Sequence, residues 1–192
     1  MEQSLHLDSH TTALILVDLQ HGIVSRQTAP YEANDVVSKG AHLARLFREK
    51  GATVVYVRVD LADMLQLPVD APLRDPNSPP PPPQASELVS AAGVRDEDLV
   101  VTKRQWGAFF GTNLEKQLRE RGIQTVVLGG IATNFGVEST ARAAAGLGFA
   151  VVVAEDATTS FNQEAHHFAM KTIFPRLGRV RTVDQICAGI TN

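Results

Sequence analysis

Reactive side chains follow several short apolar runs in this sequence. Asp18 comes directly after ALILV at 13–17, and Lys103 comes directly after LVVT at 99–102. Ligands of open parallel sheets bind beyond the carboxyl ends of the strands, so we expect these two side chains to meet at one edge of a sheet. A partly buried carboxyl group and amine perturb each other's pKa, and such pairs cluster at functional sites. The sequence therefore predicts a site built on an acid and an amine.

Two other aspartates and a glycine-rich segment also follow apolar runs. Asp60 and Asp156 are each alone at the end of a run, where a helix cap or a surface ion pair is the ordinary interpretation. The segment GGIATNFG at 129–136 joins a strand to the start of a helix. Free N–H groups at such a start suit a developing oxyanion or a bound carboxylate, although a glycine-rich turn by itself is also explained by tight packing.

The elements that must position these residues alternate along the chain. Apolar runs without polar alternation are typical of strands buried on both faces, and the segments between them have helical spacing. We expect strands at 13–17, 53–59, 99–102, 125–128, 149–154 and 179–181. We expect helices at 34–50, 112–121, 136–147, 162–173 and from 182 onward. This alternation predicts an α/β fold with three layers, in which helices cover both faces of a parallel sheet.

Local signals mark several helix ends. Thr112 with Glu115 and Thr182 with Gln185 have the spacing of capping boxes. Pro175 is expected to stop the helix that precedes it.

Length and charge narrow the class of protein. A chain of 192 residues predicts one domain, spanning 1–192. The formal net charge of −3 and the scattered basic residues argue against nucleic-acid binding and against a polybasic membrane patch. One cysteine, Cys187, excludes an internal disulfide and fits a reducing compartment. With neither signal-peptide features at the start nor an apolar stretch of membrane-spanning length, the expected location is the cytoplasm.

A proline-rich segment interrupts the regular alternation at 68–85. It contains five consecutive prolines, Pro79 to Pro83, which cannot lie inside a helix or a sheet and favour an exposed extended loop. The simplest interpretation is a surface connection. A lid or an oligomer contact is the alternative, because long loops in compact domains are often functional.

Three stretches together resemble one protein family. The segments VDLQ at 17–20, TKRQWGAFFGTNL at 102–114 and GGIATNFGVESTARAA at 129–144 resemble those of the isochorismatase-like hydrolases. Their order and spacing match over nearly the whole chain, and the combination is specific where any one of them is not. The resemblance implies a six-stranded parallel sheet of Rossmann-like architecture and assembly as a homo-oligomer, a dimer or higher.

The resemblance also implies roles for individual residues. Asp18 matches the catalytic aspartate and Lys103 the catalytic lysine of the family. Ile131–Ala132 matches a non-proline cis peptide bond, a costly feature usually retained where a site needs its geometry. The N–H groups of Ala132 and Gly136 match the oxyanion hole.

This sequence departs from many members of the family at Gly136. Those members are amidases with a nucleophilic cysteine at that position, and glycine closes the thioester route. Cys187 lies in the last predicted helix, matches no catalytic position and is interpreted as a packed or idle thiol. True isochorismatases can also carry glycine there, and they hydrolyse a vinyl ether without a covalent intermediate.

Vinyl-ether hydrolysis suits the residues that remain. Asp18 is expected to act as general acid, which requires burial to raise its pKa, and the Lys103 ammonium opposes that rise. We therefore assign Lys103 to orienting a substrate carboxylate or stabilising developing negative charge. Gly136 leaves room for substrate or water. The expected pocket residues are Gln20, Trp106, Phe109 and Phe135, although Trp106 and Phe109 could equally belong to the core.

No metal or cofactor is expected. Nicotinamidases of the family bind a metal through an aspartate and histidines after the second strand, but here LADMLQLP follows Asp60 without a histidine. His166 and His167 are adjacent on a predicted helix, so they point in different directions and make a poor ligand pair.

The leading hypothesis is a cofactor-free hydrolase of a small carboxylated substrate, with isochorismate as the reference. Arg58 and Arg104 are the candidate cationic partners for substrate carboxylates. The alternatives are a non-catalytic metabolite-binding relic, an amidase that works without the cysteine, and an amidase that uses Cys187. A catalytic site requires Asp18 and Lys103 to lie within hydrogen-bonding reach of each other.

Overall fold

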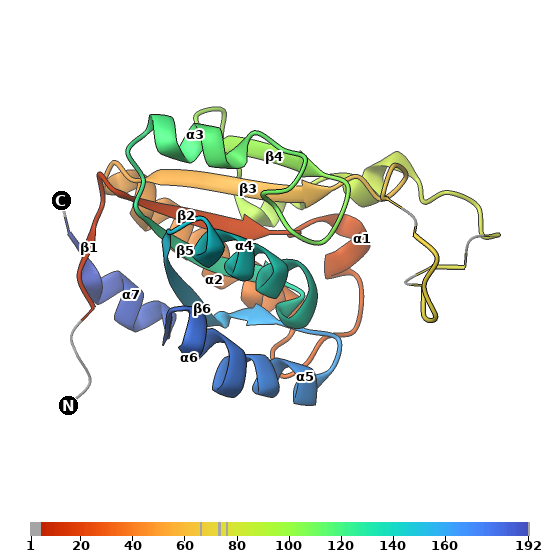
Figure 1. The fold of residues 1–192 in the computed structure, drawn as a ribbon. Helices are drawn as coiled ribbons and strands as arrows, with labels where there is room; N and C mark the ends of the chain where they lie inside the picture. The colour runs from red at the N-terminus through yellow and green to blue at the C-terminus, as the bar shows by residue number, and fades with distance from the viewer. Residues whose placement is uncertain (1–4, 66, 73, 76, 192) are drawn as a thin grey trace.

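The protein is described from a computed structural model that covers residues 5–191 except 66, 73 and 76. Its main sheet has six parallel strands in the order β4-β3-β2-β5-β6-β7 (Figure 1). The strands are β2 Thr12–Val17, β3 Thr53–Val59, β4 Leu99–Lys103, β5 Thr125–Ile131, β6 Ala150–Thr159 and β7 Arg179–Arg181. A short parallel pair, β1 Leu7–Asp8 and β8 Ile190–Thr191, joins the two ends of the chain and was not predicted.

Helices cover both faces of this sheet, which confirms the predicted three-layer α/β architecture. The α-helices are α1 His21–Val24, α2 Ala33–Glu49, α3 Leu114–Glu120, α4 Glu138–Gly146, α5 Gln163–Phe168, α6 Phe174–Leu177 and α7 Val183–Gly189. Two π-helical turns, η3 Thr133–Val137 and η4 Ala169–Ile173, and two 3₁₀ turns, η1 Pro83–Ser86 and η2 Ser90–Ala92, complete the set. None of the helices among the described residues is long and apolar enough to cross a membrane.

The central strand β2 explains why the core has two halves. All six of its residues are buried. Because side chains alternate across a strand, Leu14 and Leu16 join the cluster beneath α2 and α7, whereas Ile15 and Val17 join the cluster beneath α3, α4 and α6. A continuous apolar run is therefore required here, since both sheet faces are covered.

The carboxyl ends of the central strands lie level with one another. Val17 of β2 is in register with Val57 on one side and Gly130 on the other, and Lys103 of β4 is in register with Val59. Residues at the carboxyl ends of β2, β4 and β5 therefore meet at one edge, the right-hand end of the sheet in Figure 1.

Gly130 is required by the close packing of β5 against β2. Its φ is +123°, and a Cβ atom there would lie 2.1 Å from the carbonyl oxygen of Val17. The pairing of β5 with β6 also shifts register between Leu128 and Gly130. This irregularity re-aims the chain just before the turn that approaches Asp18.

Two predicted boundaries are wrong. β6 runs on to Thr159 instead of ending near Asp156, whose carboxylate binds Lys39 of α2 at 2.6 Å and accepts the Val183 N–H of α7 at 2.7 Å. The helix predicted at 162–173 continues beyond Pro175. The π-turn η4 ends the earlier hydrogen-bond pattern, so Pro175 falls in the first turn of α6, where its missing N–H costs nothing.

One of the two predicted capping boxes forms. Thr182 accepts the Gln185 N–H at 3.3 Å and donates its own N–H to the Gln185 side chain at 3.0 Å, so that box is confirmed. The box predicted at Thr112 is wrong. The Thr112 hydroxyl instead donates to the Ala108 carbonyl at 2.6 Å, and α3 begins after Asn113 without a side-chain cap.

Most of the described part of the proline-rich segment at 68–85 projects away from the body of the molecule in Figure 1, and its last residues return to it at η1. Of its five consecutive prolines, Pro79, Pro80, Pro82 and Pro83 are exposed, and η1 begins at Pro83. Positions 73 and 76 of the segment lie outside the described residues.

Candidate active site

Asp18 begins the site, as the first residue after β2. Its N–H donates to the Val57 carbonyl at 2.8 Å, which extends the sheet hydrogen bonding by one residue. Its φ of +56° is left-handed, a conformation that aspartate tolerates better than most residues. The backbone thereby turns sharply, and the carboxyl group lies at the carboxyl edge with only 6% of the residue exposed.

Lys103 reaches Asp18 from two strands away. Parallel strands are spaced about 4.8 Å apart, so β4 and β2 lie about 9.6 Å apart, and the lysine side chain, the hydrogen bond and the aspartate side chain together bridge that span. The ammonium Nζ lies 2.8 Å from Asp18 Oδ2 and donates to the Trp106 carbonyl at 2.7 Å. Lys103 is 2% exposed. The sequence prediction that these two residues meet is confirmed by this contact.

Burial dominates the electrostatics of the aspartate. Loss of water raises the pKa of Asp18 above its ordinary value, although the charge of Lys103 and its hydrogen bond lower it. The second carboxyl oxygen, Oδ1, is buried and has no hydrogen-bond partner among the described residues. Asp18 therefore combines a tendency to hold a proton with one unengaged oxygen.

Gly136 lies against this pair. A Cβ atom there would be 3.0 Å from Val17 Cγ1, 3.1 Å from Asp18 Oδ2 and 3.3 Å from Lys103 Nζ. These separations are tighter than normal carbon contacts, so the acid and the amine occupy the space that a side chain at 136 would need.

The glycine-rich turn η3 carries Gly136 to this position. The Ile131–Ala132 peptide bond at its start is cis. The Ala132 carbonyl accepts the N–H groups of Phe135 and Val137 at 3.1 and 3.2 Å. Three side-chain hydrogen bonds anchor the turn to its surroundings: Thr133 to His166, Asn134 to Ser160, and Gly136 to Thr140. The predicted oxyanion positions thus belong to a tightly held segment beside Asp18.

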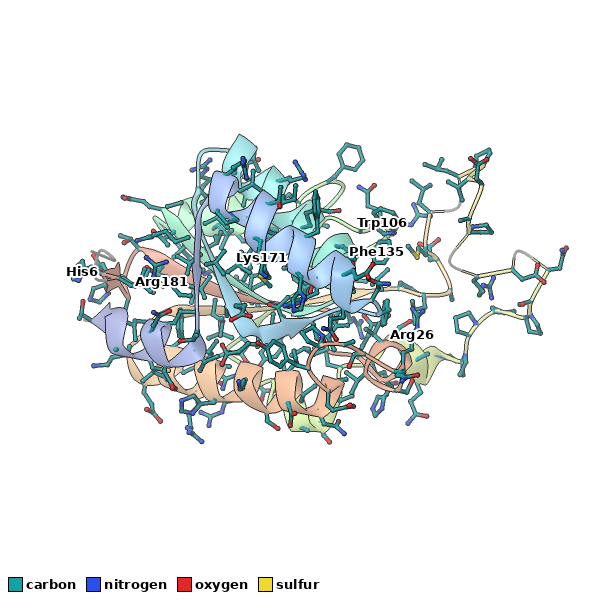
Figure 2. All side chains as sticks on the ribbon, turned by 90° about the horizontal axis from the view of Figure 1, so that it is seen from below. His6, Arg26, Trp106, Phe135, Lys171 and Arg181 are labelled. Atoms are coloured by element: carbon teal, nitrogen blue, oxygen red, sulfur yellow. The ribbon has the colours of Figure 1, made fainter. Side chains whose placement is uncertain are left out.

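Two of the four predicted pocket residues lie together at this edge. The rings of Trp106 and Phe135 meet edge to face, with centroids 4.9 Å apart. Figure 2 shows both at the end of the molecule where the strands end. Trp106 is 43% exposed, and its carbonyl accepts from Lys103. The pair can therefore shield the acid and the amine from solvent.

Phe109 does not line the site. It is buried in the core, with its ring centroid 5.9 Å from that of Phe149. The loop after β4 turns back into the sheet face at Ala108, so the next side chain packs inward. The pocket prediction for Phe109 is wrong, and the core alternative holds.

Gln20 has a different role from the one predicted. Its amide Nε2 donates to the carbonyls of Val59 and Ala85 at 2.9 and 3.1 Å, and its Oε1 accepts the Val59 N–H at 2.8 Å. The residue is fully buried. Gln20 therefore joins the ends of β2 and β3 to η1, and it positions the edge instead of lining a pocket.

The two arginines proposed as anion partners are engaged elsewhere. Arg104 pairs with Asp63 at 2.6 Å, and Arg58 donates to the Thr102 hydroxyl at 3.0 Å. A further cation, Arg26, has its guanidinium 3.7 Å from the centroid of the Phe161 ring. It makes no ion pair with any residue that the structure describes. Figure 2 places it at the same end as Trp106 and Phe135.

Of the remaining candidates, Cys187 lies apart from the acid and the amine, whereas the Asp60 N–H donates to the Lys103 carbonyl at 3.1 Å. Cys187 is on α7, a helix that lies near β1 in Figure 1, and its sulfur is 3.6 Å from His42 Nε2. Burial raises the pKa of this thiol. The Asp60 carboxylate accepts the N–H groups of Ala62 and Asp63 and so caps a turn. Nowhere in the described chain do three metal-ligating side chains come together.

The fold and the site define an α/β protein with helices on both faces of its sheet and a buried acid–amine pair at the carboxyl edge. Comparison with known proteins gives its family. The profile of the Isochorismatase domain matches residues 12–185. The isochorismatase family protein YecD of Escherichia coli O157:H7 is 47% identical over 188 residues, covering 95% of this chain and 97% of its own. An isochorismatase family protein of Burkholderia thailandensis superposes with a TM-score of 0.90 at 44% identity, covering 97% and 98% of the two chains.

The chain therefore belongs to the isochorismatase family and is a hydrolase. Amidohydrolases are also among its relatives. The ureidoacrylate amidohydrolase RutB of Klebsiella pneumoniae is 38% identical over 109 residues, which are 55% of this chain and 45% of RutB. The N-carbamoylsarcosine amidase of Thermoplasma acidophilum superposes with a TM-score of 0.72 at 26% identity, covering 91% and 97% of the chains.

Proposed function

We propose that this hydrolase cleaves the vinyl ether of a small carboxylated substrate, with Asp18 as general acid and without a covalent intermediate. The observation that carries the proposal is the contact of 2.8 Å between Asp18 and Lys103, against a glycine that offers no nucleophile. The reaction needs only an acid, a cation and water, and this edge of the sheet supplies the first two.

The unpartnered oxygen of Asp18 is the proposed proton donor. Oδ2 faces Lys103, whereas Oδ1 has no partner among the described residues. The proton on Oδ1 passes to the methylene carbon of the substrate, and the double-bond electrons form the new C–H bond. The resulting oxocarbenium ion takes up water at the ether carbon. The hemiketal then breaks its C–O bond to give a keto acid and an alcohol, and the proton released by the water returns to Asp18.

Lys103 supports both ends of this step. Its ammonium has three N–H donors, and Asp18 and the Trp106 carbonyl take two of them. The third can orient the substrate carboxylate, while the existing contact stabilises the Asp18 carboxylate once the proton has left. The Ala132 and Gly136 N–H groups are proposed to hold negative charge on the substrate. Trp106 and Phe135 are proposed to exclude bulk water.

Amide hydrolysis is the second candidate, because RutB and N-carbamoylsarcosine amidase are relatives. An amidase without a side chain at 136 would have to use water, activated by the Asp18 carboxylate. A binding relic is disfavoured, because a buried acid–amine pair is costly to keep when it does no chemistry. We further propose that the chain works in the cytoplasm, without a cofactor, as a homo-oligomer.

The test is release of pyruvate from isochorismate, run beside a panel of enol ethers and amides. Asp18→Asn should lower vinyl-ether turnover by about 10²- to 10⁴-fold, because general acid catalysis is lost. Asp60→Asn is the matched control, because the Asp60 carboxylate only caps a turn, and the backbone N–H that contacts Lys103 is kept in this variant. It should retain activity. Equal turnover by wild type and Asp18→Asn would remove the acid assignment. Amide turnover that survives exhaustive thiol alkylation would favour the water-based amidase.

A further inference from the structure

A histidine outside the acid–amine pair contacts the turn that carries Gly136. His166 on α5 is completely buried, and its Nδ1 lies 2.8 Å from the hydroxyl of Thr133, the first residue of η3. Thr133 is also completely buried. It directly follows Ala132, so this hydrogen bond joins α5 to the segment between the two proposed oxyanion amides.

The other ring nitrogen of His166 shows that the histidine is not simple packing. Nε2 is buried and has no hydrogen-bond partner among the described residues. Leaving a buried polar atom unpaired destabilises the fold, so an apolar side chain would fill this space at a lower cost. An apolar side chain at position 166 could not form a hydrogen bond with the Thr133 hydroxyl, and a buried hydroxyl needs a hydrogen-bond partner.

We propose that His166 is a positioning residue of the active site, holding the Thr133 end of η3 so that the Ala132 and Gly136 amides face the substrate. The proposal rests on the proposed function for its catalytic readout. The other two anchors of the turn come from Ser160 at the end of β6 and from Thr140 on α4. His166 is the anchor that can titrate, and it acts through Thr133 without touching substrate.

The surroundings keep the imidazole neutral. Burial, and secondarily the neighbouring His167, lower the pKa of His166 to about 4. Tyr31 packs its ring edge against the imidazole with centroids 5.8 Å apart, and its own pKa is raised to about 12. The groups that face the ring are therefore Thr133, neutral Tyr31 and His167. A protonated ring would carry an N–H on both nitrogens, and the one on Nε2 has no acceptor among the described residues.

Four variants test the role. His166→Asn keeps a polar atom near the Nδ1 position, His166→Leu removes it, and Thr133→Val removes only the hydroxyl. His167→Leu is the matched control, because this exposed histidine is next along the same helix. The measurements are kcat and KM for vinyl-ether hydrolysis, and the backbone ¹⁵N–¹H shifts of Ala132 and Gly136 in the folded proteins.

The expected result separates positioning from folding. His166→Leu and Thr133→Val should each lower kcat about 10- to 100-fold while KM stays within about twofold, because small misplacements of catalytic groups act on the transition state. The double variant should be no slower than either single variant. His166→Asn should recover most of kcat, and the Ala132 and Gly136 shifts should move in the impaired variants but not in His167→Leu.

Each arm of the experiment can overturn a different claim. If wild type cleaves no vinyl ether, the proposed function fails, and the amide shifts alone decide the role of His166. If those shifts stay at their wild-type values in His166→Leu and Thr133→Val, His166 does not position the turn. If His166→Leu does not fold, Thr133→Val and His166→Asn carry the same comparison.

Discussion

The absence of a side chain at Gly136 lets Asp18 and Lys103 pack directly against the backbone of η3. The contacts of 3.0–3.3 Å that a Cβ would make with Val17, Asp18 and Lys103 show that the pair has closed into this space. We predict that Gly136→Ala lowers the free energy of unfolding by about 1–3 kcal/mol through overpacking. Gly107→Ala is the control, because its Cβ would meet Ser139 at an ordinary 3.6 Å. Equal midpoints in urea denaturation for the two variants would contradict the packing argument.

The Asp18 carboxyl group depends on Lys103 for its charged form. We predict that Lys103→Met raises the pKa of Asp18 further, because burial then acts without the opposing ammonium. A carboxyl group whose pKa is raised on folding destabilises the folded state once the pH is high enough to ionise it in the unfolded chain. The free energy of unfolding of Lys103→Met should therefore fall further below that of wild type as pH rises. The difference should reach about 3–5 kcal/mol where wild-type Asp18 is ionised. Carboxyl ¹³C NMR titration and urea denaturation at several pH values give the two measurements.

Lys39→Met is the control for this prediction. Lys39 also binds an aspartate, Asp156, at 2.6 Å, but its side chain is 40% exposed. Removal of an exposed ion pair costs about 1 kcal/mol or less. A similar cost for both lysine variants at every pH would show that burial does not govern the Asp18–Lys103 pair.

At the scale of elements, the close approach of β5 to β2 depends on Gly130. We predict that Gly130→Ala costs more than about 3 kcal/mol of unfolding free energy, because a methyl group 2.1 Å from the Val17 carbonyl forces the strands apart next to the site. Gly148→Ala separates the effect of a steric clash from that of backbone strain. Gly148 also has a positive φ, of +83°, but an added Cβ there would meet no atom within 4 Å. Gly148→Ala should cost about 1 kcal/mol. Thermal unfolding compares the two, and equal losses would assign the effect to φ alone.

Helix boundaries show where local sequence is an incomplete guide. The Thr182 capping box forms, whereas the same pattern at Thr112 does not, because α3 begins one residue later, after Asn113, and the Thr112 hydroxyl accepts the Leu114 N–H instead of that of Glu115. Pro175 does not end the helical segment, because η4 changes the hydrogen-bond pattern before it. Both errors have one cause. Whether a hydroxyl caps a helix, or a missing N–H breaks one, depends on the backbone groups that the fold places next to it.

At the scale of the whole molecule, His166 should make stability depend on pH. Its pKa is lowered to about 4 in the folded protein, whereas an unfolded histidine titrates near 6.5. Between these values the unfolded chain binds more protons, so stability should fall as pH drops from about 6.5 to 4, by up to about 3 kcal/mol. The slope of unfolding free energy against pH should be shallower in His166→Asn than in wild type. Identical slopes would mean that His166 does not titrate differently in the two states.

The sequence by itself determined the alternation of strands and helices, and with it the placement of Asp18 and Lys103 at one edge of the sheet. Both follow from local information, because periodicity defines each element and parallel strands bring their carboxyl ends to one edge. Only the tertiary structure decided that Asp18 and Lys103 come into contact, that Gln20 braces β3 and η1, that Phe109 is core, and that His166 contacts the turn that carries Gly136. Each of these depends on contacts between segments far apart in the chain, and side-chain identity alone does not specify which distant backbone or ring a residue will meet.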